Sequence, residues 1–334
     1  MLNLIIKREK LKLKSFQTIL SDDLERFREQ YRNTLLSGAP NIDRIVNHLT
    51  NSSGKALRPM LTLLCARLAG GEPNEDTIRA AVIVELLHEA TLVHDDVVDD
   101  ADKRRGLLSI SGRFQNKVAV LFGDYMLSKV LVETLASRNL QWLDILGDTA
   151  QRMAYGELKQ AMHAKRLDLD EAGYINVISD KTASLFSAGC QIGGITVGLD
   201  QQMCDQLAKF GNHFGISFQI QDDMLDIFGD GSLLGKPTGK DFKERKMTLP
   251  LLAAMKIAPD KESRRIRARI RRGLKFNEMK LIREFIVKYE GDIAAEALLK
   301  DHLENAKFAL DSFPHSQAKE QLINLTEYAI TRKI

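Results

Sequence analysis

The chain has 334 residues, enough for one large domain or two small ones, and its 44% hydrophobic content is enough to bury a sizeable core. Its net charge of +3 gives no case for nucleic-acid binding, and no apolar run reaches the roughly 18 residues that span a bilayer. Cys65, Cys190 and Cys204 have no metal-binding spacing, which indicates reduced core residues in a reducing compartment such as the cytoplasm. Residues 1–14 lack the apolar core and cleavage site of a secretory signal, and we expect a flexible basic tail there.

Helical periodicity dominates the rest of the chain, and strand patterns are nearly absent. Helices are predicted at about 58–70, 75–102, 116–137, 140–165, 171–198, 200–228 and 248–257, with several more toward the C-terminus. Because no repeat or linker interrupts them, residues 1–334 are predicted to form a single all-α domain. The helix at 171–198 contains Gly189, Gly193, Gly194 and Gly198, which allow either tight helix packing or the close approach of a ligand.

The first basic residues of interest stand at a turn that leads into a helix. Lys55 and Arg58 fall within residues 53–59, and the free N–H groups of the helix N-terminus make this segment a candidate diphosphate cradle. Further along, His88 lies two helical turns before Asp95, on the same face of one helix. We interpret His88 either as a hydrogen-bonded core residue or as a ligand of the substrate.

Two aspartate clusters share the same spacing. They are Asp95-Asp96-Val97-Val98-Asp99 and Asp222-Asp223-Met224-Leu225-Asp226. In a helix, the first and last aspartates of each cluster lie on one face about a turn apart, where like charges repel. Carboxylate oxygens, together with water and phosphate oxygens, are the ligands that Mg²⁺ prefers, so the clusters are predicted to bind Mg²⁺. For either cluster alone, a solvated acidic helix face is the alternative.

Basic residues follow both clusters. Arg104 and Arg105 come after the first, where they would complement the dipole at the end of a continued helix or bind phosphate oxygens. Residues 228–249 come after the second and combine several glycines with lysines that include Lys236 and Lys246. Such a segment predicts either a lid that closes over a diphosphate or a solvated loop.

In their order and separation, these residues resemble the motifs of the trans-polyprenyl diphosphate synthases over essentially the whole chain. The matching segments are Gly54-Lys55-Ala56-Leu57-Arg58-Pro59, His88, the first aspartate cluster with Arg104-Arg105-Gly106, Gly123-Asp124-Tyr125, Gly156-Glu157, Lys181-Thr182, residues 218–223, and Gly239-Lys240-Asp241 with Lys246. The resemblance implies an isoprenoid synthase fold, a helical bundle around a central apolar cavity. It also implies head-to-tail condensation of isopentenyl diphosphate with an allylic diphosphate, such as farnesyl diphosphate, to a long all-trans polyprenyl diphosphate.

The resemblance also implies roles for the matched residues. The principal Mg²⁺ ligands would be Asp95, Asp99 and Asp222, supported by Asp96, Asp223 and Asp226, with three ions in each active site. The allylic diphosphate would be held by Arg104, Lys181, Thr182, Gln219 and Lys246, with Lys236 as a further contact from the lid. Isopentenyl diphosphate would be held by Lys55, Arg58, His88 and Arg105.

The implied chemistry agrees with these residue types. The allylic diphosphate loses pyrophosphate to form a cation, so catalysis requires positive charge on the leaving group from Mg²⁺ and from side chains such as Lys181 and Lys246. The departing pyrophosphate can accept the proton that is lost at the end, so no histidine or glutamate base is needed. Water would quench the cation, which makes an apolar cavity and a closing lid chemical requirements.

Side-chain volume in the helix before the first cluster bears on product length. Thr91 and Leu87 lie one and two turns before Asp95, and the resemblance adds Ala90 as a position where an aromatic residue gives short products. Because Ala90 and Thr91 are small, we predict a long product such as octaprenyl diphosphate, used for a quinone side chain, with the tunnel floor near Leu146. The alternative is a deeper block that gives geranylgeranyl or farnesyl diphosphate.

Three other functions compete with this one. A class I terpene cyclase also carries an aspartate-rich motif, but it would not need a second diphosphate site. His94-Asp95 is the dyad of helical metal-dependent phosphohydrolases, which would leave the second cluster unexplained. A regulatory subunit of a two-component synthase would be expected to have lost aspartates or lysines that this chain keeps. We also expect a homodimer, with apolar residues of the helix at 116–137 as one candidate interface.

Overall fold

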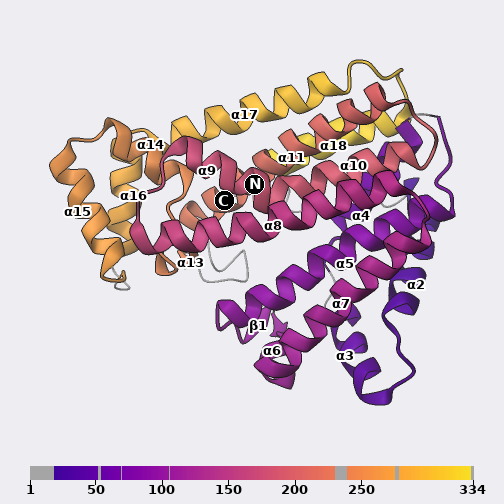
Figure 1. Ribbon diagram of the computed structural model, residues 1–334. Helices are drawn as coiled ribbons and strands as arrows, with labels where there is room; N and C mark the ends of the chain where they lie inside the picture. The colour runs from indigo at the N-terminus through magenta and orange to yellow at the C-terminus, as the bar shows by residue number, and fades with distance from the viewer. Residues whose placement is uncertain are drawn as a thin grey trace, which may run out of the picture. The chain divides into compact units, whose positions relative to one another are not determined.

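Residues 19–51, 54–68, 70–104, 106–229, 239–274 and 278–331 are described in the computed structural model of the chain. Within them the protein is helical, with one two-stranded sheet, as predicted for an all-α fold (Figure 1). The predicted tail at 1–14, Arg105 and Lys236 lie outside the described residues. None of the described helices is long and apolar enough to cross a membrane.

Most predicted helices are present, with small differences at their ends. In chain order the described elements are α2 (Ser21–Leu35), α3 (Pro40–Asn51), α4 (Leu57–Leu68), α5 (Glu75–Val98), β1 (Lys103–Arg104), β2 (Leu107–Leu108), α6 (Ile110–Phe114), α7 (Asn116–Ala136), α8 (Leu140–Arg166), α9 (Glu171–Ile178), the π-helical turn η1 (Ser179–Ala183), α10 (Ser184–Ile195), α11 (Gln201–Phe228), α13 (Lys240–Lys243), α14 (Leu249–Ile257), α15 (Asp260–Arg271), α16 (Glu278–Lys288), α17 (Gly291–Ala309) and α18 (Gln317–Thr331). The predicted helix at 171–198 is therefore α9 and α10, which η1 joins without a break.

The helix that carries the first aspartate cluster is shorter than predicted, because α5 ends at Val98 rather than near residue 102. Asp99 still donates its N–H to the carbonyl of Asp95 at 2.8 Å, so the two carboxylates keep their helical spacing. Asp100 then adopts a left-handed backbone conformation with φ 48°, and the chain leaves the helix for the hairpin of β1 and β2. The predicted continuation of the helix to Arg104 is wrong for this reason.

The chain divides into two compact units, which are described separately. The first comprises Met1–Ala150, Leu185–Ala208 and Leu310–Asn324, and the second comprises Gln151–Ser184, Lys209–Ala309 and Leu325–Ile334. Two of the boundaries fall inside α8 and α11 rather than at a linker. The single domain predicted from the sequence stays a prediction.

In the first unit, α5 is a central helix that runs along α7 and also packs against α4 and α2 (Figure 1). Nearly all of its side chains from Ile78 to Leu87 are buried, as expected for a helix with neighbours on all sides. The approach of α10 to α4 is very close, because a Cβ atom on Gly193 would lie 2.4 Å from the carbonyl oxygen of Thr62. The glycines at 189–194 therefore serve helix packing. The three cysteines are buried free thiols, as predicted.

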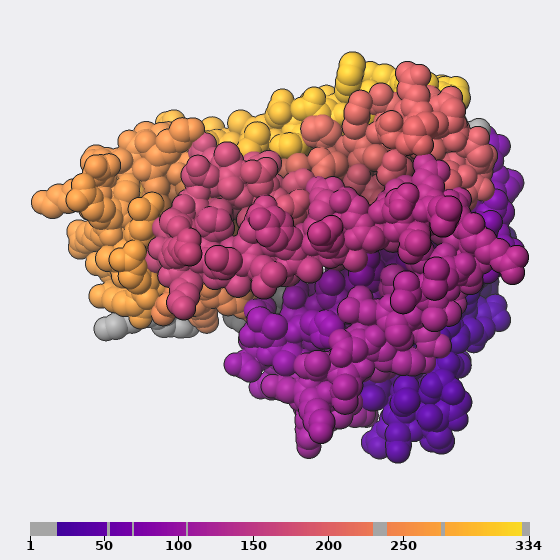
Figure 2. All heavy atoms as spheres, in the orientation of Figure 1, coloured from indigo at the N-terminus to yellow at the C-terminus, as the bar shows by residue number. Residues whose placement is uncertain are grey.

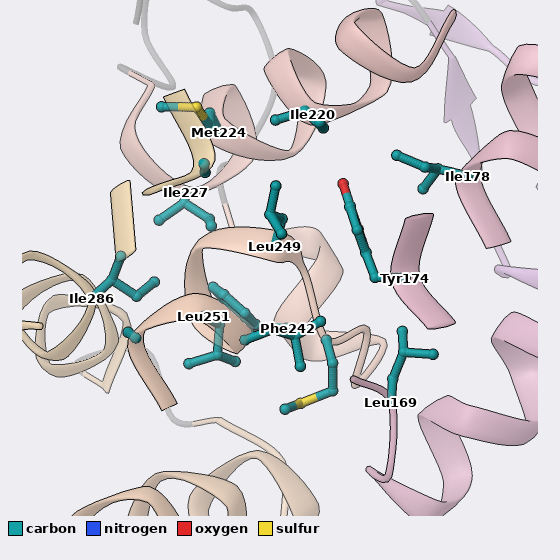
Figure 3. Close-up of a cluster of buried hydrophobic side chains, with 14 of the residues drawn as sticks. Leu169, Tyr174, Ile178, Ile220, Met224, Ile227, Phe242, Leu249, Leu251 and Ile286 are labelled. Carbon is teal, nitrogen blue, oxygen red and sulfur yellow. The ribbon is translucent and has the colours of Figure 1, made fainter. Parts of the chain in front are cut away.

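The core of the second unit is an apolar cluster to which α9, α11, α13, α14, α15, α16 and α17 contribute. Figure 3 shows Phe242, Leu249 and Leu251 together in this cluster. The hydroxyl end of Tyr174 points toward the space between Ile178 and the α11 residue Ile220. This core fixes the helices that carry the second aspartate cluster and the residues around it.

Two half-buried histidines also link α11 to α17 in the second unit. The Nδ1 atoms of His213 and His302 are 2.9 Å apart, so one ring donates a hydrogen bond to the other. Burial lowers the pKa of both side chains, and the neighbouring charge of His213 lowers the pKa of His302 further. Burial therefore favours the neutral form of both imidazoles.

Candidate active site

The first aspartate cluster combines one buried and two more accessible carboxylates. Asp96 is buried and accepts hydrogen bonds from Arg104, with Nε–Oδ2 and Nη2–Oδ1 distances of 2.8 Å. Burial lowers the pKa of the Arg104 guanidinium, but the hydrogen bond and charge of Asp96 and the charge of Glu89 outweigh it, so the pKa is raised. Asp95 and Asp99 remain half-buried. Asp96 thus fixes the hairpin, while the outer two carboxylates face partly toward solvent.

His94, which precedes the cluster, is held against α7. Its Nε2 atom lies 3.2 Å from the carbonyl oxygen of Val120 and 3.5 Å from Oδ1 of Asp124. A Cβ atom on Gly123 would lie 2.2 Å from this nitrogen, so the contact requires glycine. The histidine of the phosphohydrolase-like dyad therefore contacts a neighbouring helix.

The first unit also brings together two residues predicted to bind isopentenyl diphosphate. Nη1 of Arg58 at the start of α4 lies 2.9 Å from Nε2 of His88 on α5. The same guanidinium stacks over the ring of Phe186, with 4.2 Å from Cζ to the ring centroid. Lys55 is exposed in the turn before α4. Both alternatives weighed for His88 fit this geometry, because it is hydrogen-bonded and its partner is a cation suited to a diphosphate.

In the second aspartate cluster, two of the carboxylates are bound by protein donors. Asp223 is buried and accepts hydrogen bonds from the Tyr174 hydroxyl at 2.7 Å and from the Gln219 amide at 2.8 Å. Asp226 accepts from the backbone N–H groups of residues 239, 240 and 241 at 3.1–3.2 Å. Asp222 is half-buried. Asp226 therefore anchors the backbone of residues 239–241 to α11.

A pocket in the second unit brings together three of the six residues predicted to hold the allylic diphosphate. Lys181, Gln219, Asp223 and Lys246 line it together, beside apolar side chains of α9 and residues 247–248. Thr182 donates its hydroxyl hydrogen to Oε1 of Gln219 at 2.9 Å, which orients the amide toward Asp223. The predicted residues from three separate segments thus meet around one cavity.

Both lysines of the pocket are paired with carboxylates. The Lys181 ammonium lies 2.5 Å from Glu157 and 2.9 Å from the side-chain oxygen of Gln160, both on α8. The Lys246 ammonium lies 2.5 Å from Glu244 and 3.9 Å from Asp241. A diphosphate that binds these lysines must therefore compete with carboxylates already in place.

The carboxyl groups around this pocket ionise with difficulty. Burial raises the pKa of Asp223 to about 6, although the hydrogen bonds from Tyr174 and Gln219 oppose the shift. Burial and the nearby charges of Asp223 and Asp226 raise the pKa of Asp241 well above its usual value. Burial and the charge of Asp223 raise the pKa of the Tyr174 hydroxyl as well. Additional positive charge at this site would therefore be stabilised.

The carboxylates of the two aspartate clusters suit Mg²⁺ that binds together with a substrate diphosphate. Among the described residues, no three His, Cys, Asp or Glu side chains converge into a ready-made metal site. Mg²⁺ commonly takes one or two carboxylates from the protein and its other ligands from water and phosphate oxygens. Asp95 and Asp99 in the first unit and Asp222 in the second carry half-buried carboxylates, which suits the ligand role expected of them. Asp96, Asp223 and Asp226 have protein partners that hold the clusters in place.

The positions assigned to product length lie inside the first unit. Ala90 and Leu87 are buried on α5, and Thr91 is half-buried with its hydroxyl bonded to the carbonyl of His88. Leu146 of α8 packs in an apolar cluster with Trp142, Ala80, Ile83 and Ile192.

Sequence reasoning missed several residues of the second-unit pocket. Tyr174, Gln160 and His163 also line it, but none of them carries a motif that points to a diphosphate. The pairing of Glu157 with Lys181 could have been found, because Gly156-Glu157 stood among the matched motifs.

Comparison with known proteins gives the family. The family model described as "Polyprenyl synthetase" matches residues 39–287. The chain belongs to the polyprenyl synthetase family. It is 31% identical to octaprenyl diphosphate synthase of Haemophilus influenzae, over 98% of this chain and 99% of that protein. It is 34% identical to heptaprenyl diphosphate synthase component 2 of Geobacillus stearothermophilus, over 95% of this chain and 98% of that protein.

A solved structure agrees with this assignment. The fold superposes on a crystal structure of a polyprenyl synthase from Caulobacter crescentus CB15, complexed with calcium and isoprenyl diphosphate. The TM-score is 0.90 at 32% sequence identity, and the match covers 96% of this chain and 98% of the other. The isoprenoid synthase fold expected from the sequence is confirmed.

Proposed function

We propose that this chain is a trans-prenyltransferase that adds isopentenyl diphosphate units, head to tail, to an allylic diphosphate and produces a long-chain all-trans polyprenyl diphosphate. The observation that carries the proposal is the pocket where Lys181, Gln219, Asp223 and Lys246 meet in a member of the polyprenyl synthetase family. The long product is supported by the octaprenyl and heptaprenyl names of the two relatives. A quinone side chain is the proposed use of this product.

The aspartate clusters are proposed to act with Mg²⁺, which when bound supplies Lewis-acid charge to the leaving pyrophosphate. Asp95, Asp99 and Asp222 would be the protein ligands. Calcium and isoprenyl diphosphate in the Caulobacter relative support a divalent cation and a diphosphate for this chain as well. Three ions are proposed, as the resemblance to the polyprenyl diphosphate synthases implies.

The chain's own residues would then carry the reaction. Lys181 and Lys246 exchange their carboxylate partners for oxygens of the allylic diphosphate and stabilise the charge of the departing pyrophosphate. Arg58 and His88 hold the diphosphate of isopentenyl diphosphate, whose alkene attacks the allylic cation. The pyrophosphate accepts the proton released from the new chain. Apolar side chains beside the pocket keep water away from the cation.

Product length is proposed to depend on the interior of the first unit. Ala90 and Thr91 offer little volume near the first aspartate cluster, which favours a chain that grows beyond farnesyl length. The cluster of Leu146 with Trp142 and Ile83 is proposed as the floor. A geranylgeranyl or farnesyl product is the alternative if the chain stops before this floor.

We also propose that the enzyme is a cytoplasmic homodimer that associates through α7. Leu121, Leu131, Val132 and Leu135 of this helix are each more than half exposed, which is unusual for large apolar side chains on one helix. Figure 2 shows α7 on the face toward the viewer. The free cysteines suit a reducing compartment. Sedimentation equilibrium should give twice the 37.6 kDa of one chain, and a monomer at micromolar concentration would contradict the proposal.

One incubation separates this function from its rivals. The purified protein is mixed with Mg²⁺, farnesyl diphosphate and isopentenyl diphosphate, and the dephosphorylated products are separated by chromatography. Elongated prenyl alcohols support the proposal. A cyclic hydrocarbon would indicate a terpene cyclase, and phosphate release without elongation would indicate a phosphohydrolase. No reaction would indicate a subunit that needs a second component, as the name of the Geobacillus relative shows for that protein.

A further inference from the structure

The π-helical turn η1 interrupts the regular helix that α9 and α10 would otherwise form. It spans Ser179–Ala183 and contains two of the predicted substrate residues, Lys181 and Thr182. A π turn holds one residue more than an α turn, so its loss would rotate those side chains by about 100° relative to α9. The presentation of Lys181 and Thr182 to the pocket therefore depends on whatever stabilises this turn.

Charged side chains of α8 form ion pairs with two neighbouring residues of η1 that carry opposite charges. Asp180 pairs with Arg152 at 3.1 Å and with Lys159 at 3.4 Å. The next residue, Lys181, pairs with Glu157 of the same helix at 2.5 Å. The charges of α8 thus match the order of charges in the turn, and a shift of the turn by one residue would place like charges together.

Between these charged residues, α8 has a glycine that lets the turn approach. A Cβ atom on Gly156 would lie 2.7 Å from the backbone nitrogen and 3.1 Å from the Cα atom of Lys181. Any side chain there would push the turn away from α8. The backbone of Lys181 is therefore in close contact with α8, and the ion pairs of Asp180 hold the same turn from the preceding residue.

We propose that Asp180 is a positioning residue, which uses its ion pairs with Arg152 and Lys159 to hold η1 on α8 and so sets Lys181 and Thr182 for the allylic diphosphate. Asp180 has only 19% of its side chain exposed, and the hydroxyl of Ser184 donates to its carbonyl oxygen at 2.6 Å, so the residue is fixed at both its side chain and its backbone. Asp180 itself does not line the pocket. The inference rests on the proposed function, because it needs Lys181 to bind the allylic substrate.

The test compares Asp180→Asn, which keeps the size and removes the charge, with Lys181→Ala and with the control Glu262→Gln. Glu262 also forms an ion pair with a lysine, Lys288 at 2.9 Å, but on the exposed surface of α15 and α16. KM and kcat are measured for farnesyl diphosphate at saturating isopentenyl diphosphate, and KM for isopentenyl diphosphate separately. Asp180→Asn should raise KM for farnesyl diphosphate by roughly tenfold, leave KM for isopentenyl diphosphate within about twofold, and resemble Lys181→Ala in this pattern. Glu262→Gln should match the wild type.

A double variant provides a second test of the positioning role of Asp180. Arg152→Gln alone should shift the same parameters as Asp180→Asn but less, because Lys159 still pairs with Asp180, and the two substitutions together should be no worse than Asp180→Asn alone. Additive losses, equal effects on both substrates, or a wild-type KM in Asp180→Asn would each overturn the positioning role. If the wild type does not elongate farnesyl diphosphate, the proposed function fails. If only Lys181→Ala is without effect, the elongation activity stands, but Lys181 and with it Asp180 lose their role.

Discussion

Ala90→Phe should shorten the product while the enzyme stays active. Ala90 lies five residues before Asp95 on α5, which corresponds to about 7.5 Å along the helix axis. One helical turn of about 5.4 Å is close to the length of an isoprene unit, so a phenyl ring at this depth should stop chain growth within a few units of the diphosphate end. The expected product is farnesyl or geranylgeranyl diphosphate instead of a long chain.

A second substitution tests whether product length depends on the depth of the blocking side chain. Leu87 lies eight residues before Asp95, about 12 Å along the axis, so Leu87→Trp should block the tunnel nearly one isoprene unit deeper than Ala90→Phe. If a tunnel passes Ala90, the ring occupies existing space and thermal stability changes little. If Ala90 is packed on all sides, the ring overpacks the core at a cost of about 1–3 kcal/mol and lowers the melting temperature.

Chromatography of the dephosphorylated products measures the length directly, with wild type at the same substrate ratio as the control. Unchanged long chains from an active Ala90→Phe enzyme would show that the product does not pass this residue. Equal product lengths from the Ala90 and Leu87 variants would contradict the depth argument even if both were short.

Three further predictions concern the metal, the substrates and pH. Asp95→Ala and Asp222→Ala should each lower kcat by orders of magnitude with an unchanged circular dichroism spectrum, since each removes a half-buried carboxylate; near-normal turnover at saturating Mg²⁺ would exclude the ligand role. In substrate titrations, Arg58→Ala should mainly raise KM for isopentenyl diphosphate, and Lys246→Ala should mainly raise KM for the allylic substrate. Each increase should correspond to a loss of about 1.5–3 kcal/mol of binding free energy. Because the pKa of His302 is lowered in the folded state, the unfolded state binds more protons below about pH 6.5, and the free energy of unfolding falls as the pH falls. Urea titrations at about pH 7.5 and 5.5 measure this loss, which should be smaller in His302→Asn than in the wild type.

The helical fold and most of the site could be predicted from the sequence because they depend on local spacing. The two aspartate clusters and the start of α4 with Arg58 are recognisable from residue type and order, whereas Lys181 is assigned through the family resemblance and its π-helical turn is not predicted. The glycines of α10 show where such reasoning stops. Helix packing and ligand approach both favour small residues. Packing is decided only by the backbone of Thr62, whose carbonyl oxygen would lie 2.4 Å from a Cβ atom on Gly193.

Other features could not be predicted because they depend on partners far away in the sequence. Spacing does not reveal that Asp96 binds Arg104 of β1 or that Asp226 binds the backbone of residues 239–241. The end of α5 depends on the left-handed conformation of Asp100, which the helical pattern through residue 102 does not reveal. The link from Tyr174 to Asp223 joins residues 49 positions apart.

The most direct test of the account is the stoichiometry of elongation. With Mg²⁺, farnesyl diphosphate and radiolabelled isopentenyl diphosphate, the label incorporated into the prenyl chain and the pyrophosphate released are counted in the same reaction. A prenyltransferase releases one pyrophosphate for each isopentenyl unit added, and several units should be added to each farnesyl group. Pyrophosphate release that does not depend on isopentenyl diphosphate, or label that never enters a prenyl chain, would contradict the account.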